Sequence, residues 1–267
     1  MGELGDAAIL LLILVGGSAL GIMVRPFLSE HHRSRETTDL IQLVMTMLVT
    51  FAALVLGLLT SSVKASFDTV DNDLRSFSIQ LIQLDRSLKQ YGGGTEPARA
   101  LLRSYTAAAI ASTWTTEPQP PGDYYPKQVS PPPSAESIQS TSLGDMLAHL
   151  EADLRQLDPP DPMHRRLALT ILNQYELLMR MRWKLIEEAY SSISPPFAIV
   201  LSFWLVIIFA SFGLSAPRNA LSYITILLGA LSIASVVFVI LDLDTPFSGL
   251  FMVASEPMRD ALAQLNH

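Results

Sequence analysis

The chain has 267 residues, of which 49% are apolar, and it carries a net charge of −7 and a mean hydropathy of +0.34. This hydropathy is high for a soluble domain, and the acidic balance argues against nucleic acid as a partner. Because the chain contains no cysteine, it can form neither a disulfide framework nor a thiolate metal site.

Four apolar runs account for the hydropathy. Each has 18 to 21 residues without a charged side chain, close to the length with which a helix crosses a bilayer: Ala7–Val24, Leu40–Leu59, Phe197–Ala216 and Leu221–Leu241. Between Lys64 and Glu188 lie 29 of the 43 charged residues. We therefore predict an all-α membrane protein with four transmembrane helices in two pairs and a helical extramembrane domain inserted between them. The expected domains are residues 1–62, 63–194 and 195–267, the last ending in an interfacial helix.

The first apolar run is expected to be a retained span rather than a secretory signal. Glu3 and Asp6 precede it, and no Lys or Arg does, which is the wrong charge for a signal peptide. An even number of spans places both termini and the central domain on one side of the membrane. The basic residues near the spans do not decide which side that is.

The second apolar run continues as a long helix. A heptad seam with spacings of 3 and 4 follows it, formed by Val63, Phe67, Val70, Leu74, Phe77, Leu81, Leu84 and Leu88. No Pro or Gly interrupts the helix from Leu58 to Tyr91, so one helix is predicted over about 38–89, ending at Gly92-Gly93-Gly94. The seam must pack either on another helix of the domain or on the same helix in neighbouring subunits.

A second face of this long helix is polar or small. In the membrane it contains Gln42, Thr46, Thr50, Ala53, Gly57 and Ser61, and it continues with the charged residues Lys64, Asp68, Asp71 and Arg75. Polar side chains facing lipid are unfavourable, so this face should meet protein or water. One interpretation is close helix packing, with Ala53 and Gly57 as small contacts and the threonines bonded to the backbone. The other is a pore wall that leads into a charged vestibule.

Three more helices are predicted in the central domain, over about 95–116, 142–157 and 163–191. Thr95 and Ser142 are candidate N-caps, and a proline-rich loop precedes the second of these helices. The last helix has two apolar stripes, which suggests a central place in the bundle. Residue patterns at Gly17-x-x-x-Gly21 and at Ser222, Thr225, Gly229 and Ser232 are expected to mark helix contacts in the membrane.

Signatures of enzymes are missing from the sequence. The motifs of zinc proteases, serine hydrolases, P-loop enzymes and dinucleotide-binding proteins do not occur, and the five histidines are scattered along the chain. We therefore expect no catalytic residues, no metal site and no cofactor.

The stretch "LDLDTPFSGLFMVASEPM" begins where the fourth span ends. Asp242 and Asp244 are expected at the membrane boundary, followed by a turn at Pro246 and Gly249 and an interfacial segment containing Phe247. The two carboxylates could be ordinary boundary charges that reach water, or they could pair with basic residues near the third span, namely Arg180, Arg182 and Lys184. A final helix is predicted from about Glu256.

Several stretches resemble a family of bacterial membrane proteins called bestrophin-like. They are "GLLTSSVKASFD", "IQLDRSLKQYG" followed by "ARALLRSY", and "LDLDTPFSGLFMVASEPM". The resemblance implies two spans, a helical domain and two further spans. Bestrophins are pentameric anion channels whose second membrane helix lines the pore. The likeness therefore implies a homo-oligomer, pentameric by analogy, in the bacterial inner membrane.

Two functions remain as hypotheses. The first is an ion channel lined by the second span, with the lipid bilayer, further copies of the chain and inorganic ions as partners. The apolar neck residues of bestrophins cannot be matched to positions in this sequence, so gating and selectivity do not carry over. The mixed charges from Lys64 to Arg75 leave the sign of the permeant ion open. The alternative is a membrane-anchored interaction or signalling module that conducts no ions.

Overall fold

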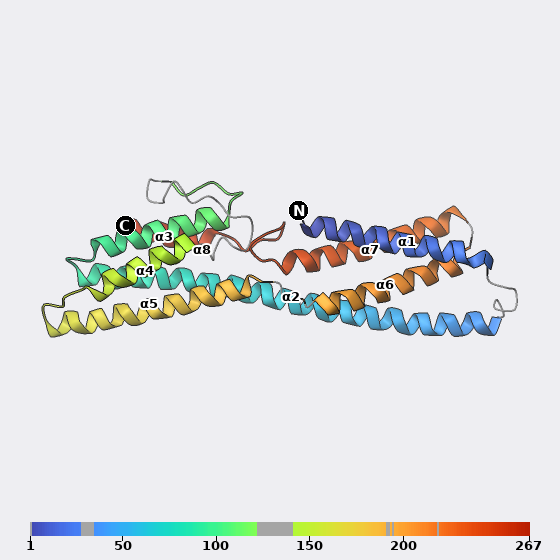
Figure 1. The fold of residues 1–267 in the computed structure, drawn as a ribbon, viewed down its shortest axis with the longest axis horizontal. Helices are drawn as coiled ribbons and strands as arrows, with labels where there is room; N and C mark the ends of the chain where they lie inside the picture. Colours follow the sequence, from blue (N-terminus) through green and yellow to red (C-terminus); the bar gives the residue numbers. More distant parts are fainter. Residues whose placement is uncertain (1, 28–34, 122–140, 191–192, 194, 218) are drawn as a thin grey trace. The chain divides into compact units, whose positions relative to one another are not determined.

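The structure is a computed structural model that describes residues 2–27, 35–121, 141–190, 193, 195–217 and 219–267. Every regular element in these ranges is helical (Figure 1). The elements are α1 (Gly2–Val24), the short 3-10 helix η1 (Arg25–Phe27), α2 (Arg35–Tyr91), α3 (Glu96–Thr113), α4 (Thr141–Arg155), α5 (Pro162–Glu188), α6 (Pro195–Ser215), α7 (Ala220–Leu243) and α8 (Glu256–Leu265). The predicted all-α class is confirmed, as is the continuation of the second span into a 57-residue helix.

The chain divides into two compact units. The membrane unit comprises Met1–Ala65 and Ser191–Asp244, and the helical unit comprises Ser66–Tyr190 and Thr245–His267. Within the described residues, four helices are long and apolar enough to cross a membrane, namely α1, α2, α6 and α7. One boundary differs from expectation, because Thr245–His267 belongs to the helical unit and not to the second transmembrane pair. The reason is that α8 packs against α3 through an apolar face.

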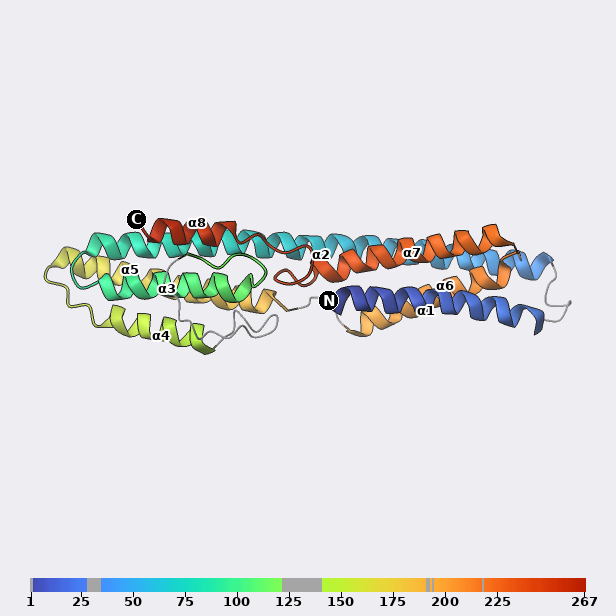
Figure 2. The same cartoon turned by 90° about the horizontal axis from the view of Figure 1, so that it is seen from above.

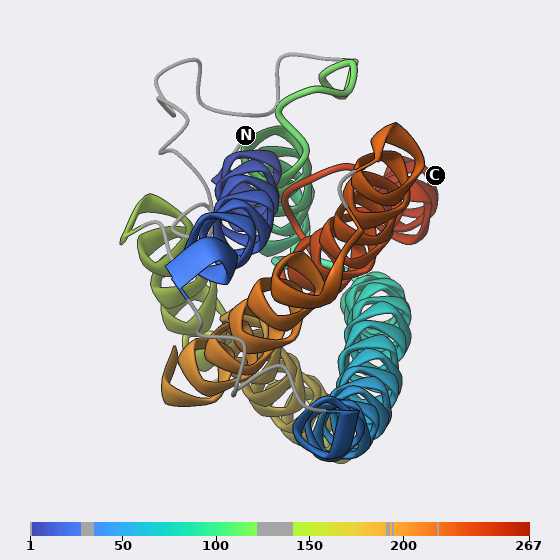
Figure 3. The same cartoon turned by 90° about the vertical axis from the view of Figure 1, so that its right-hand side faces the viewer.

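In the membrane unit, α1 packs alongside α6 and α7 (Figures 2 and 3). Glycines allow the backbones of α1 and α6 to touch. A Cβ atom at Gly21 would lie 2.0 Å from the carbonyl oxygen of Ala210, and one at Gly213 would lie 2.0 Å from the carbonyl oxygen of Ser18. Gly17-x-x-x-Gly21 therefore marks a helix contact, as predicted, and it meets the backbone of α6 at Ala210 and Leu214.

The polar pattern on α7 does not mark a comparable contact. Thr225 and Ser232 are exposed, and their hydroxyl groups donate to the carbonyl oxygens of Leu221 and Leu228, each at 2.9 Å. The helix itself thus satisfies these hydroxyl groups, which explains why they need no neighbouring helix. Gly229 lies near α6, with the Phe209 ring 3.9 Å from where its Cβ would be.

The core of the helical unit contains the heptad seam of α2. Six seam residues are at most 4% exposed and join one core with side chains of α3, α4, α5 and α8: Val70, Leu74, Phe77, Leu81, Leu84 and Leu88. Phe67 is partly buried against the same core. The seam therefore packs on other helices of the same chain, which is one of the two arrangements expected for it.

The ends of the helices differ in detail from the predictions. Gly92 and Gly94 have φ angles of 85° and 90°, which other residues rarely adopt, and they end α2 as expected. Thr95 precedes α3 but does not cap it with its side chain. Its hydroxyl group instead donates to the carbonyl oxygens of Leu88 and Gly92, at 2.9 and 2.8 Å, and so closes the turn behind it.

Helix α5 starts with a cap that the sequence analysis missed. The Asp161 carboxylate accepts a hydrogen bond from the backbone N–H of His164 at 2.9 Å, and Pro162 occupies the first turn. Both apolar stripes of α5 contribute buried residues, including Ile171 and Leu178 from one and Tyr175 from the other. The proline-rich loop falls largely on residues 122–140, which lie outside the described residues.

Candidate pore-lining face of α2

The predicted polar face of α2 is exposed in the membrane unit. Its six residues, Gln42, Thr46, Thr50, Ala53, Gly57 and Ser61, are all classed as exposed. The other side of the same helix is packed, since Ala52, Leu56 and Val63 are 3%, 7% and 1% exposed and belong to the apolar core with α1, α6 and α7. Helix α2 thus has one narrow side that the chain covers, and the described residues leave open both the polar face and apolar residues beside it, such as Leu43 and Leu54.

The hydroxyl groups on this face are bonded within the helix. Thr46 donates to the carbonyl oxygen of Gln42 and Thr50 to that of Thr46, both at 2.8 Å. Threonines bonded in this way place oxygen atoms on the helix surface without needing a neighbouring helix. This agrees with one element of the packing interpretation.

The small residues Ala53 and Gly57 make no close helix contact among the described residues of the chain. A Cβ atom at Gly57 would meet nothing within 4 Å among the described residues. Ala53 borders an apolar hollow of about 280 Å³ between α2, α6 and α7 rather than a closely packed helix. A contact through Ala53 and Gly57 would therefore need a second subunit.

The charged residues continue along α2. Lys64, Asp68 and Arg75 are exposed, and Asp71 is half-buried. Arg75 Nε donates to Asp71 Oδ2 at 3.0 Å, as expected for residues four apart on a helix. This pair cancels its own charge locally, so it gives a vestibule no strong preference for either sign of ion.

The motif after the fourth span is less exposed than predicted. Asp242 and Asp244 are only 1% and 7% exposed, so they are not boundary charges in contact with water. Buried carboxylates persist where they are paired or hydrogen-bonded. Of the three basic residues suggested as their partners, Lys184 binds Asp73 at 2.8 Å within the helical unit. Pairing of the two aspartates with the suggested basic residues stays a prediction.

The rest of the motif forms a closed loop docked on α3. The N–H of Val253 donates to the carbonyl oxygen of Pro246 at 2.9 Å, and Gly249 has a φ angle of 97°. Phe247 meets the Trp114 ring edge-on, with centroids 6.1 Å apart, and Trp114 Nε1 donates to the Val253 carbonyl oxygen at 2.8 Å. The loop therefore anchors the C-terminal segment to the helical unit.

Comparison with known proteins agrees with the motifs. A family model described as the Bestrophin-like domain matches residues 12–258. The chain belongs to the bestrophin-like family. No curated protein matched this bestrophin-like chain.

The fold is shared with solved structures of bacterial Bestrophin homologs from Klebsiella pneumoniae. One of these single-residue variants is 13% identical, with a TM-score of 0.63, and the alignment covers 98% of this chain and 100% of that one. Another is 14% identical with a TM-score of 0.65, covering 99% and 97%. At this identity, the likeness establishes the fold alone. The family model is what confirms the resemblance that the sequence motifs indicated.

Two motif pieces of the bestrophin-like chain meet in the helical unit. Asp85 lies in "IQLDRSLKQYG" and Arg99 in "ARALLRSY", and Arg99 Nε donates to Asp85 Oδ1 at 2.8 Å. Arg99 Nη2 makes a second bond to Asp85 Oδ2 at 3.4 Å, and both side chains are nearly buried, at 11% and 7% exposed. This pair was not predicted from the sequence. The sequence did contain an indication that these charges are buried, because Asp85 directly follows the core residue Leu84 and Arg99 directly follows the core residue Ala98.

Replacing Trp114 with Phe should loosen the C-terminal segment of this protein. The substitution keeps an aromatic ring but leaves the buried Val253 carbonyl without its donor, which we expect to cost about 1–3 kcal/mol. Thermal unfolding in detergent and the rate of proteolytic release of α8 would measure the effect. Trp183→Phe is the matched control, because Trp183 is 59% exposed and should change stability by less than about 0.5 kcal/mol. Equal effects of the two substitutions would contradict the proposed anchor.

Proposed function

We propose that this protein is a homo-oligomeric ion channel of the cell membrane, pentameric by analogy with bestrophins, in which the polar face of α2 lines the pore. Membership of the bestrophin-like family supports a channel. The observation that carries the assignment of the pore is that this exposed face is polar or small, whereas the exposed residues beside it, such as Leu54 and Leu58, are apolar and suit lipid. A bacterial inner membrane is the proposed location.

The physical argument rests on the cost of facing lipid. Gln42 and Ser61 present polar groups at the two ends of the stretch, and Gly57 leaves backbone exposed between them. Such a surface is poorly matched to hydrocarbon and well matched to water or to a neighbouring subunit. Arranging several copies around an axis with this face inward would remove it from lipid and create a polar passage.

The absence of native cysteine allows a direct test of the pore. Single substitutions to Cys at Thr46, Thr50, Ala53 and Gly57 should react with charged, membrane-impermeant thiol reagents, and the reaction should change ion flux in liposomes. Leu56→Cys is the matched control, because Leu56 lies on the same helix but is 7% exposed and packed. It should remain unmodified under the same conditions.

The oligomeric state decides between this proposal and its alternative. Particle imaging of the purified chain should show a ring with α2 at its axis. A monomer or dimer without ion flux would contradict the channel and favour a membrane-anchored interaction module. Labelling of Leu56→Cys as fast as Thr50→Cys would contradict the assignment of the pore face even if the protein conducts ions.

A further inference from the structure

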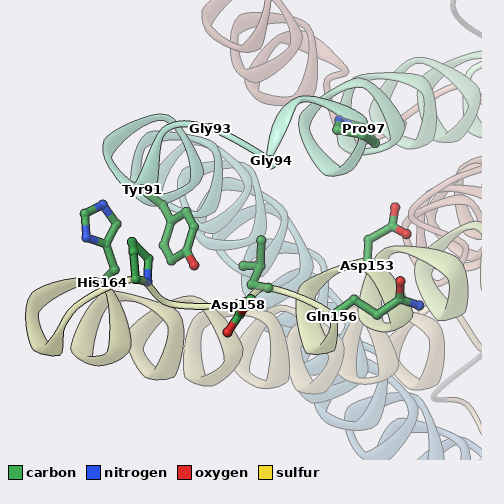
Figure 4. A pocket seen from close by; sticks show the side chains of 10 residues that line it. Tyr91, Gly93, Gly94, Pro97, Asp153, Gln156, Asp158 and His164 are labelled. Atoms are coloured by element: carbon green, nitrogen blue, oxygen red, sulfur yellow. The ribbon is translucent and has the colours of Figure 1, made fainter.

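The helical unit contains a pocket of about 620 Å³ that is separate from the α2 face (Figure 4). It lies where the turn between α2 and α3 faces the segment that joins α4 to α5. Its volume falls in the range of small-molecule sites, about 300–1,000 Å³. The pocket belongs entirely to the helical unit, and nothing in the proposed ion conduction requires it.

Tyr91 places a buried polar group at this pocket. Its side chain extends from the end of α2 toward the segment that carries Asp158 (Figure 4), and the residue is only 6% exposed. Within the described residues, its hydroxyl group is buried and has no hydrogen-bond partner. The ring is held by an edge-on contact with His164, with centroids 5.2 Å apart. Buried hydroxyl groups in proteins are normally hydrogen-bonded, so this one indicates a missing partner.

The pocket has a negative character. Asp153 and Asp158 line it, and none of the described lining residues is Lys or Arg. Burial raises the pKa of Tyr91, and the negative charges of Asp158 and Asp161 raise that pKa further. A phenol resists ionisation near carboxylates because a second negative charge there is unfavourable.

The three aspartates near the pocket are not equivalent. The Asp161 carboxylate already has hydrogen-bond partners. It accepts a hydrogen bond from the backbone N–H of His164 at 2.9 Å and is hydrogen-bonded to the His164 ring at 2.7 Å. Among the described residues, the side chains of Asp153 and Asp158 take part in no hydrogen bond or ion pair. These two carboxylates therefore remain as acceptors for a ligand.

We propose that this pocket binds a small organic ammonium compound. The carboxylates of Asp153 and Asp158 pair with protonated amino groups, and the Tyr91 hydroxyl group accepts a further N–H hydrogen bond. Pro97 and Leu157 supply apolar contacts for an alkyl chain. A metal ion fits less well, because the described residues contain no group of three or more His, Cys, Asp or Glu side chains that could hold one.

Calorimetric titration of the full chain in detergent with 1,4-diaminobutane tests the proposal. The diamine should bind saturably with a Kd below about 1 mM, and the uncharged isostere 1,4-butanediol should bind at least about tenfold more weakly. Asp153→Asn and Asp158→Asn should each weaken diamine binding about tenfold, because they remove charge while keeping shape. Tyr91→Phe should weaken it about threefold. Glu176→Gln, an exposed carboxylate on α5 away from the pocket, should leave it unchanged.

Several outcomes would overturn the assignment. Equal binding of the diol and the diamine would show that charge is not recognised, and no saturable binding of the diamine would remove the site altogether. Unchanged affinity in all three pocket variants would place any binding elsewhere. Displacement of the diamine by Ca²⁺ alone, in proportion to Ca²⁺ binding, would assign the pocket to a divalent cation. The comparison of diol and diamine uses the native chain, so it holds even if a variant fails to fold.

Discussion

Gly21→Ala should severely destabilise the membrane unit, although it adds a single methyl group. The added Cβ would lie 2.0 Å from the Ala210 carbonyl oxygen and 2.8 Å from the Leu214 nitrogen, both of them backbone atoms that cannot rotate away. Helices α1 and α6 would have to separate, and close packing between small residues is a main source of helix association in lipid. We expect a loss of about 4 kcal/mol or more, seen as a large fall in the thermal midpoint of the purified protein.

A series of glycines on the same helix provides the controls. At Gly16 an added Cβ meets nothing within 4 Å, and at Gly17 it meets Val206 at an ordinary 3.4 Å. Gly16→Ala should therefore be neutral or slightly stabilising, because alanine is the better helix former, and Gly17→Ala should cost little. Gly213→Ala should reproduce the effect of Gly21→Ala from the other helix. Similar midpoints for the variants at 16 and 21 would contradict the observed crossing of α1 and α6.

The spans and the long helix could be predicted because their signals are local. Length and apolarity identify a transmembrane helix, and the 3-4 spacing from Val63 to Leu88 identifies a packed seam, without knowledge of the partner. The partner itself could not be predicted. Gly17-x-x-x-Gly21 indicated a close contact, but nothing nearby in the sequence points to the stretch of α6 around Ala210 that it meets.

The polar face of α2 could be predicted from the sequence, but its environment could not. Helical periodicity groups Thr46, Thr50 and Gly57 on one face from the sequence alone. Whether such a face meets water or protein depends on the other subunits, which no pattern within one chain describes. Among the described residues, this face is exposed and Gly57 has no packing partner. The remaining alternatives are therefore water and a second subunit.

The pocket at Tyr91 and the burial of Asp242 escaped prediction for a shared reason. Isolated charges beside turns and at span ends are usually solvated, and for Asp242 the sequence left both contact with water and pairing with a basic residue open. The outcome depended on which segments fold back over them. The turn after Tyr91 faces the segment that joins α4 to α5, which is a tertiary contact that no local sequence pattern describes.

Arg99→Met should destabilise the helical unit by about 3–5 kcal/mol, because it leaves the Asp85 carboxylate buried without its cation. Asp85→Asn should destabilise the helical unit by a comparable amount, because it leaves the Arg99 guanidinium buried without its carboxylate. Arg99→Lys should rescue only part of the loss, since an ammonium group cannot reproduce the two bonds made by Nε and Nη2. Chemical unfolding in mild detergent, followed by tryptophan fluorescence, measures each difference.

Two controls distinguish the cost of an unpaired buried charge from the loss of a salt bridge as such. One is an exposed salt bridge, and the other is a double variant that removes both buried charges. Arg155 binds Glu151 at 2.7 Å, with both side chains open to solvent, so Arg155→Met should cost less than about 1 kcal/mol. The double variant Asp85→Leu/Arg99→Met removes both buried charges and should recover much of the stability lost in either single variant. Losses that simply add in the double variant would mean that the two residues act independently. Near-complete recovery would instead indicate that the pair contributes mainly to the specificity of packing between α2 and α3.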